Sequence, residues 1–154
     1  MKSARERVPE IIKVLRREFP ESRTSLEFET PFQILVATIL AAQCTDERVN
    51  KVTPGLFRKY PAAEAFASAD REELENEIRS TGFFRNKAKS ILGAAKKVVE
   101  DFGDRVPDTM AELLTLPGVG RKTANCVLAD AFGVPGITCD THVIRLSRRL
   151  GLSG

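Results

Sequence analysis

The chain has 154 residues, of which 42% are apolar, and this length suits one compact domain or one domain with a fragment of another. Its net charge of +3 is compatible with a polyanionic partner but is too small to establish one. The longest apolar run, ILVATILAA, is too short to span a bilayer, and a secretory or transit peptide is not recognisable. Three dispersed cysteines without C-x-x-C spacing indicate reduced thiols, so we expect a cytoplasmic protein.

Apolar residues recur with helical spacing along the chain, and no segment alternates as a strand would. The first predicted helix covers residues 4–19. The segment ETPFQILVATILAAQ begins with Thr30 as N-cap and Pro31 at the first helical position, and its apolar faces predict a buried central helix. The next helix is predicted from Asp46 to about residue 52, before an interruption at Pro54-Gly55. Another is predicted in ADREELENEIRS, where Asp70 and Glu73 have capping-box spacing. The remaining helices are predicted over 85–102, in VPDTMAELLTL, over 120–132 and over 140–150. We therefore predict an all-α fold, a multi-helix bundle.

The stretch LPGVGRKTANCVL predicts a tight hairpin between two helices. Pro117 ends the first helix, and Gly118 and Gly120 can adopt backbone angles that other residues avoid. Leu116 and Val119 are expected to point inward as an apolar anchor. Without side chains on the glycines, the N–H groups at the start of the next helix can approach an anion, which the helix dipole also favours. The alternative is an ordinary helix–helix turn that contains glycines.

Two cations, Arg121 and Lys122, follow the hairpin directly and favour phosphate binding over a plain turn. They lie in the segment 118–154, which contains five basic residues and only two acidic ones. A lysine in the first turn of a helix opposes the dipole, and this position favours the neutral, nucleophilic amine. Lys122 is therefore either a solvated or phosphate-contacting cation, or a nucleophile for Schiff-base chemistry at a carbonyl or acetal carbon.

Asp140 is a candidate carboxylate partner for Lys122, eighteen positions further along the chain. A helix over 121–132 covers roughly 18 Å, and the loop 133–139 can span up to about 23 Å, so the chain can return to the start of that helix. We expect Asp140 at the start of the last helix, close to Lys122. A simple N-cap role for Asp140 is compatible with this chemistry.

Several stretches together resemble the helix–hairpin–helix DNA glycosylases, and specifically the endonuclease III family. They are, in chain order, FQILVATILAAQCTDERVNKVTP, STGFFRNKAKSI, VPDTMAELLTLPGVG, LPGVGRKTANCVL and DTHVIRLSRRLGL. The resemblance covers the chain from about residue 5 and implies base excision repair of duplex DNA. The implied reaction removes oxidised or damaged pyrimidines and cleaves the strand 3′ to the lesion by β-elimination. Through DNA binding, it also implies association with the nucleoid.

The resemblance implies catalytic roles for two residues. Lys122 matches the lysine that attacks C1′ of the flipped nucleotide, displaces the base and forms an imine. Asp140 matches the aspartate that assists activation and stabilises developing positive charge. Relatives that only remove bases, including mismatch-directed ones, lack the lysine, so its presence favours a bifunctional enzyme. The alternative is a non-catalytic helix–hairpin–helix DNA-binding fragment.

The resemblance also implies DNA-contacting residues. Base flipping leaves a hole in the stack that a side chain can fill. Gln43 matches the family's inserting glutamine, and Phe83 matches an apolar wedge position; the alternatives are helix capping for Gln43 and an ordinary core aromatic for Phe83. His142 is left outside the catalytic set. The expected DNA-binding residues are Gln43, Phe83, Gly118, Val119, Gly120 and Arg121.

Most members of the family carry four C-terminal cysteines that bind a four-iron four-sulfur cluster. Cys44, Cys126 and Cys139 do not match that pattern, and the sequence given ends before that region, so we expect no cluster or other metal in this chain. The expected domains are an N-terminal helix, 1–22, which would pack on the cluster region, and a helical domain, 23–154, with the hairpin motif at about 108–132. Without that cover, we expect the N-terminal stripe to contact a partner or a second copy through Val8, Ile11, Leu15 and Phe19.

Overall fold

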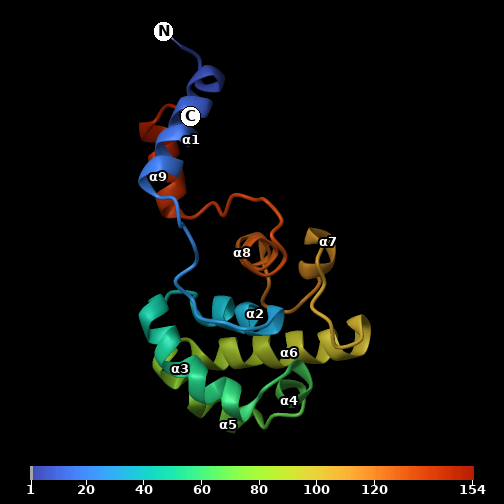
Figure 1. The fold of residues 1–154 in the computed structure, drawn as a ribbon. Helices are drawn as coiled ribbons and strands as arrows, with labels where there is room; N and C mark the ends of the chain where they lie inside the picture. Colours follow the sequence, from blue (N-terminus) through green and yellow to red (C-terminus); the bar gives the residue numbers. More distant parts are fainter. Residues whose placement is uncertain (1) are drawn as a thin grey trace. The chain divides into compact units, whose positions relative to one another are not determined.

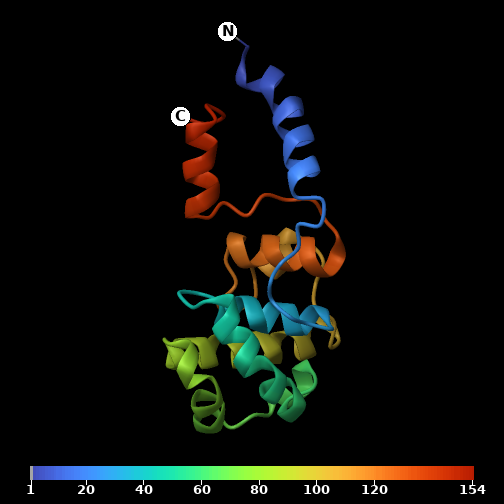
Figure 2. The same ribbon diagram turned by 60° about the vertical axis from the view of Figure 1, so that its left-hand side comes forward.

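The computed structural model describes residues 2–154, and within that range it is all helical, as the sequence predicts (Figures 1 and 2). The described residues form two compact units, one of residues 24–137 and the other of residues 2–23 with 138–154. The larger unit contains α2 (Pro31–Leu40), α3 (Asp46–Lys59), α4 (Ala63–Ala67), α5 (Arg71–Ile78), the 3-10 turn η1 (Arg79–Thr81), α6 (Phe84–Phe102), α7 (Met110–Leu113) and α8 (Arg121–Phe132). The smaller unit contains α1 (Ala4–Glu18) and α9 (Thr141–Arg149).

Helix α2 is the buried centre of the larger unit, as its sequence predicts. The Thr30 hydroxyl accepts a hydrogen bond from the Gln33 N–H (3.2 Å), and Pro31 occupies the first helical position. Figures 1 and 2 both show α2 between α8 on one side and α6 on the other. Because α2 is covered on both sides, its apolar side chains are enclosed, and they are Phe32, Ile34, Leu35, Val36, Ala37, Ile39 and Leu40.

Helix α3 corrects one prediction. The sequence predicted an interruption at Pro54-Gly55, but α3 continues through both residues to Lys59. Proline cannot donate to the carbonyl four residues earlier, and its ring crowds that carbonyl, which normally ends or kinks a helix. Here burial on both sides of the proline keeps the helix intact, because Val49, Thr53 and Leu56 are all buried in the core.

Helices α5 and α6 begin and end close to the predicted residues. The Asp70 carboxylate accepts from the Glu73 N–H (2.9 Å), which confirms Asp70 as the N-cap of α5. Gly103 ends α6 in the left-handed conformation. Two short elements were not predicted: α4, which precedes α5, and η1, which lies between α5 and α6. Both are too short to show a helical period in the sequence.

The smaller unit pairs the two ends of the described chain. The Arg7 guanidinium of α1 donates to the carbonyls of Leu150 (2.7 Å) and Gly151 (2.9 Å) after α9. The division into an N-terminal helix, 1–22, and a helical domain, 23–154, stays a prediction. Helix α1 buries none of its side chains. The exposed apolar residues of the helix and of its C-cap, Phe19, are Val8, Ile12, Val14, Leu15 and Phe19.

Candidate nucleic-acid interface

The glycine hairpin joins α7 to α8 and packs against the side of α6. Gly118 has φ +74°, and a Cβ there would lie 2.3 Å from the Ser90 Cβ, so only glycine fits. At Gly93, one turn further along α6, an added Cβ would make a tight contact of 3.0 Å with the Pro117 ring. Leu116 and Val119 are buried at 2% and 7% exposure. The predicted apolar anchor is therefore confirmed, as is the glycine turn at Gly118. Two details were wrong: α7 already ends at Leu113, before Pro117, and Gly120 has an extended backbone (φ −97°) that any residue can adopt.

The first turn of α8 is open to solvent. Gly120 is its N-cap and carries no side chain that could accept from the leading N–H groups. Arg121 and Lys122 are both exposed there, while Ala124 is buried one turn below. Exposed N–H groups, the positive end of the dipole and two cations together form a surface suited to a phosphate.

Gln43 and Phe83 both have unusual backbone conformations. Gln43 follows the end of α2 with φ +51°, and Phe83 precedes α6 with φ +46°. Left-handed residues other than glycine carry strain, which is commonly retained where a side chain must be aimed at a ligand. The Phe83 side chain is 64% exposed, so the alternative of an ordinary core aromatic is wrong.

A cavity of about 260 Å³ brings these segments together. It is lined from three directions: by the end of α2, by the start of α6 and by the hairpin. Gln43, Phe83 and Gly118, which are far apart in the sequence, therefore share one site within the larger unit. Its lining residues are Thr38, Ile39, Ala42, Gln43, Phe83, Asn86, Lys87, Ser90, Gly118 and Thr123. Lys87 and Ser90 were missed by the sequence analysis, since a lysine or a serine on a helix carries no signal of its own.

Lys122 and Asp140 belong to different compact units. Asp140 is the N-cap of α9, and its Oδ1 accepts from the Val143 N–H (2.8 Å), so the capping role is confirmed. The convergence of the amine and the carboxylate stays a prediction.

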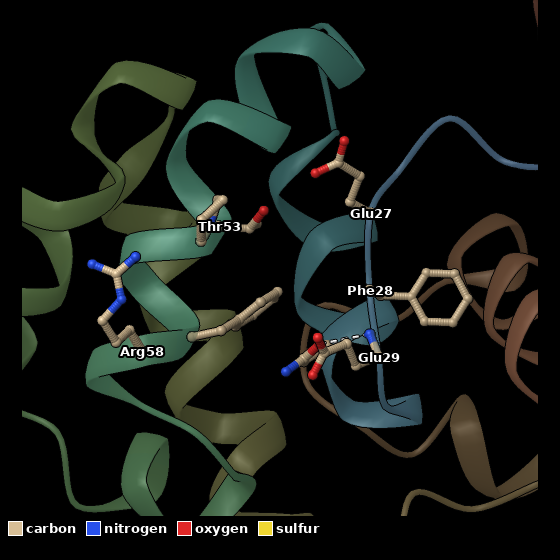
Figure 3. Close-up of a pocket in the computed structure, with 8 residues that line it drawn as sticks. Glu27, Phe28, Glu29, Thr53 and Arg58 are labelled. Atoms are coloured by element: carbon tan, nitrogen blue, oxygen red, sulfur yellow. Dashed lines mark hydrogen bonds between the residues drawn. The ribbon is translucent and has the colours of Figure 1, made fainter.

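A larger cavity, of about 510 Å³, lies between the segment before α2 and helix α3 (Figure 3). Glu27 and Glu29 line it from the segment and Arg58 from α3, while Figure 3 shows Phe28 turned away from Arg58. None of the residues predicted for the functional site lines it. Two carboxylates against one guanidinium disfavour a polyanion there.

Metal ligands do not cluster in the part of the chain that the structure describes. Residues 2–154 contain no group of three or more His, Cys, Asp or Glu side chains that could hold a metal. Cys44 precedes α3, Cys126 lies within α8 and Cys139 precedes α9. These residues do not fit a cluster with four cysteine ligands. Each helix of the described range is also too short or too polar to cross a membrane.

A profile of the HhH-GPD superfamily base excision DNA repair proteins matches residues 36–154. The chain belongs to this superfamily. Two endonuclease III proteins are similar to it. That of Synechocystis is 62% identical over 99% of this chain and 70% of its own length. That of Bacillus subtilis is 51% identical over 87% of this chain and 61% of its own length. A solved structure of a trapped covalent intermediate between endonuclease III and DNA is 43% identical, with a TM-score of 0.92 over 100% of this chain and 72% of that one.

Membership of the HhH-GPD superfamily confirms the predicted fold and the resemblance to endonuclease III. It places the chain among base excision repair proteins, and similarity over nearly the whole chain disfavours the alternative of a non-catalytic DNA-binding fragment. The chain spans between three-fifths and three-quarters of these relatives, so part of each relative has no counterpart in this sequence.

Proposed function

We propose that this protein is a bifunctional DNA glycosylase and abasic-site lyase that acts on oxidised or otherwise damaged pyrimidines in duplex DNA. One observation carries the proposal: the hairpin begins α8 with Lys122 exposed in its first turn, directly before Thr123, which lines the same cavity as Gln43 and Phe83. Endonuclease III relatives, one of them trapped covalently on DNA, support the same reaction.

In this proposal the binding surface divides into two parts. The open first turn of α8, with Gly120 and Arg121, binds a backbone phosphate and fixes the register of the duplex without reading its bases. Gln43 and Phe83 enter the stack beside the flipped nucleotide and occupy the space it leaves. Their left-handed backbones and exposure support such a role.

Lys122 is the proposed nucleophile. Its neutral Nζ bonds to C1′ of the flipped nucleotide as the glycosidic bond breaks, and the base departs with that electron pair. Loss of the amine proton and opening of the sugar ring give an imine between Nζ and C1′. A proton is then removed from C2′, and the 3′ phosphate leaves, which cleaves the strand. In a relative, such an enzyme–DNA intermediate was trapped covalently.

Asp140 is the proposed carboxylate that stabilises positive charge as the glycosidic bond breaks. The loop after α8 supports this role, because it turns back at Gly133 in the left-handed conformation. The Asn125 amide then donates to the Ile137 carbonyl (3.3 Å), so the chain has returned to the second turn of α8 by that point. Three further residues to Asp140 span at most about 10 Å, which leaves the first turn within reach.

Borohydride trapping on duplex DNA with a single abasic site tests the proposal. Borohydride reduces the imine to a stable amine, so we expect a covalent complex of the 154-residue protein with DNA, resolved by denaturing electrophoresis. Salt-dependent binding to the same duplex without a trapped complex would instead support a DNA-binding module without catalysis.

Replacing Gln43 should weaken lesion binding without loss of stability. The side chain is exposed, so Gln43→Ala removes no core packing and should change the melting temperature little. Gln43→Gly also relieves the left-handed strain at φ +51° and should melt no lower than the wild type. We expect both variants to bind a duplex with a reduced abasic site about tenfold more weakly, while undamaged duplex is bound as before. A lower melting temperature with unchanged lesion affinity would refute the inserting role.

We propose that residues 2–154 themselves bind no iron–sulfur cluster. The dispersed positions of Cys44, Cys126 and Cys139 support this. A visible absorbance spectrum of the purified chain checks this proposal, because brown absorbance from a bound cluster would contradict it.

We further propose that the protein acts in the cytoplasm at the nucleoid. We also propose that the exposed apolar stripe of α1 is its surface for a protein partner or a second copy.

A further inference from the structure

Lys87 is a buried cation at the floor of the cavity described above. It is 5% exposed, and its ammonium donates to the carbonyls of Leu40 (2.8 Å) and Thr81 (2.8 Å). Burial lowers the pKa of this amine from its ordinary value, while the nearby Cys44 opposes the shift. Burying an ammonium is costly, and hydrogen bonds to backbone carbonyls compensate only part of that cost.

The two carbonyls belong to the two segments that carry the proposed inserting residues. Leu40 ends α2, three residues before Gln43, and Thr81 ends η1, two residues before Phe83. The backbone N–H of Lys87 also donates to the Phe83 carbonyl (3.0 Å). Lys87 therefore bonds to Thr81, just before Phe83, and to Phe83 itself. It also bonds to Leu40, at the end of the helix that precedes Gln43.

We infer that Lys87 is a positioning residue that holds the Gln43 and Phe83 loops at the spacing needed to enter the DNA stack at a lesion. This rests on the proposed function. Both loops are strained, with φ +51° and φ +46°, and strained loops keep their conformation only where surrounding contacts fix it. The ammonium, with its three donors, joins segments that lie 41 residues apart in the chain, because Leu40 and Thr81 are both within its reach.

The test measures lesion discrimination, the affinity for a duplex with a reduced abasic site divided by the affinity for undamaged duplex. Lys87→Met keeps the length of the side chain but removes the charge and the donors. We expect it to lower this ratio by about tenfold, because Gln43 and Phe83 lose their fixed spacing. Affinity for undamaged duplex and its salt dependence should stay unchanged, because the hairpin makes those phosphate contacts.

A second readout reports insertion directly. With 2-aminopurine opposite the reduced abasic site, the wild type should raise its fluorescence by unstacking it, and Lys87→Met should not. Leu74→Ala is the matched control, because Leu74 is fully buried in α5 and lines no part of this cavity, so its loss destabilises the fold without removing a cavity residue or a bond to either loop. Leu74→Ala should keep both the discrimination and the fluorescence change.

The outcomes separate the inference from the function on which it rests. A wild type that does not discriminate lesion from undamaged duplex contradicts the proposed function. If the wild type discriminates and Lys87→Met discriminates equally well, the role of Lys87 alone is overturned. Equal losses of discrimination in Lys87→Met and Leu74→Ala would overturn it too. If Lys87→Met does not melt cooperatively, Lys87→Gln replaces it, since its shorter amide cannot join both carbonyls, and unchanged discrimination there also overturns the inference.

Discussion

Replacing Lys122 with alanine is expected to abolish the borohydride-trapped complex, with a loss on the order of 10³-fold or more in strand cleavage. The reason is chemical: without Nζ, no bond to C1′ can form and no imine exists to reduce. The side chain is exposed in the first turn of α8, so its loss should leave the melting temperature essentially unchanged. Binding to abasic-site DNA should persist, because the N–H groups of the hairpin remain.

Lys97→Ala is the matched control for Lys122→Ala. Lys97 is also a helical surface lysine, paired with Asp101 (2.7 Å), and it does not line the cavity. It lies seven residues after Ser90, the last residue of α6 that does, which is roughly 10 Å along the helix axis. Its removal changes the net charge equally, so trapping should proceed as in the wild type. A trapped complex of normal yield in Lys122→Ala would show that another amine is the nucleophile.

The hairpin could be predicted from the sequence because its signals are local. Pro117, Gly118 and Gly120 lie within four positions of one another, the cations follow directly, and Gly118 has the positive φ that a tight glycine turn predicts. A second reason that Gly118 must be glycine is not local, because an added Cβ would also meet Ser90 on α6. Contacts between distant segments leave no trace in the spacing of residues, so the packing surface for the hairpin was not predicted.

The error at Pro54 has a physical origin. A local rule ended the helix there, whereas burial of Val49, Thr53 and Leu56 outweighs the lost hydrogen bond. Lys87 was not predicted because a lysine in a helical segment is usually solvated. Its burial depends on Leu40 and Thr81, which only the folded structure brings next to it. The candidate inserting residues were found from a resemblance, because a left-handed backbone at glutamine or phenylalanine has no sequence signature.

Replacing Gly118 with alanine should damage folding and DNA binding together. The new Cβ would meet Ser90 Cβ at 2.3 Å and Oγ at 2.5 Å, and φ +74° is unfavourable for alanine. We expect a loss of about 1–3 kcal/mol in the free energy of unfolding, measured by urea denaturation. The hairpin must also move away from α6, so binding to undamaged duplex should weaken and its salt dependence should become shallower.

Gly55→Ala and Ser90→Gly decide whether the close contact with α6 causes this loss. Gly55 lies within α3 with nothing within 4 Å of an added Cβ, so alanine there should stabilise the helix by up to about 1 kcal/mol and leave DNA binding unchanged. Ser90→Gly removes both clashing atoms, so Gly118→Ala should cost less stability in that background than in the wild type. An equal cost in the two backgrounds would attribute the whole effect to the backbone angle. If Gly118→Ala melts and binds DNA like the wild type, the hairpin does not depend on its packing against α6, and the open first turn of α8 must be held by α8 itself.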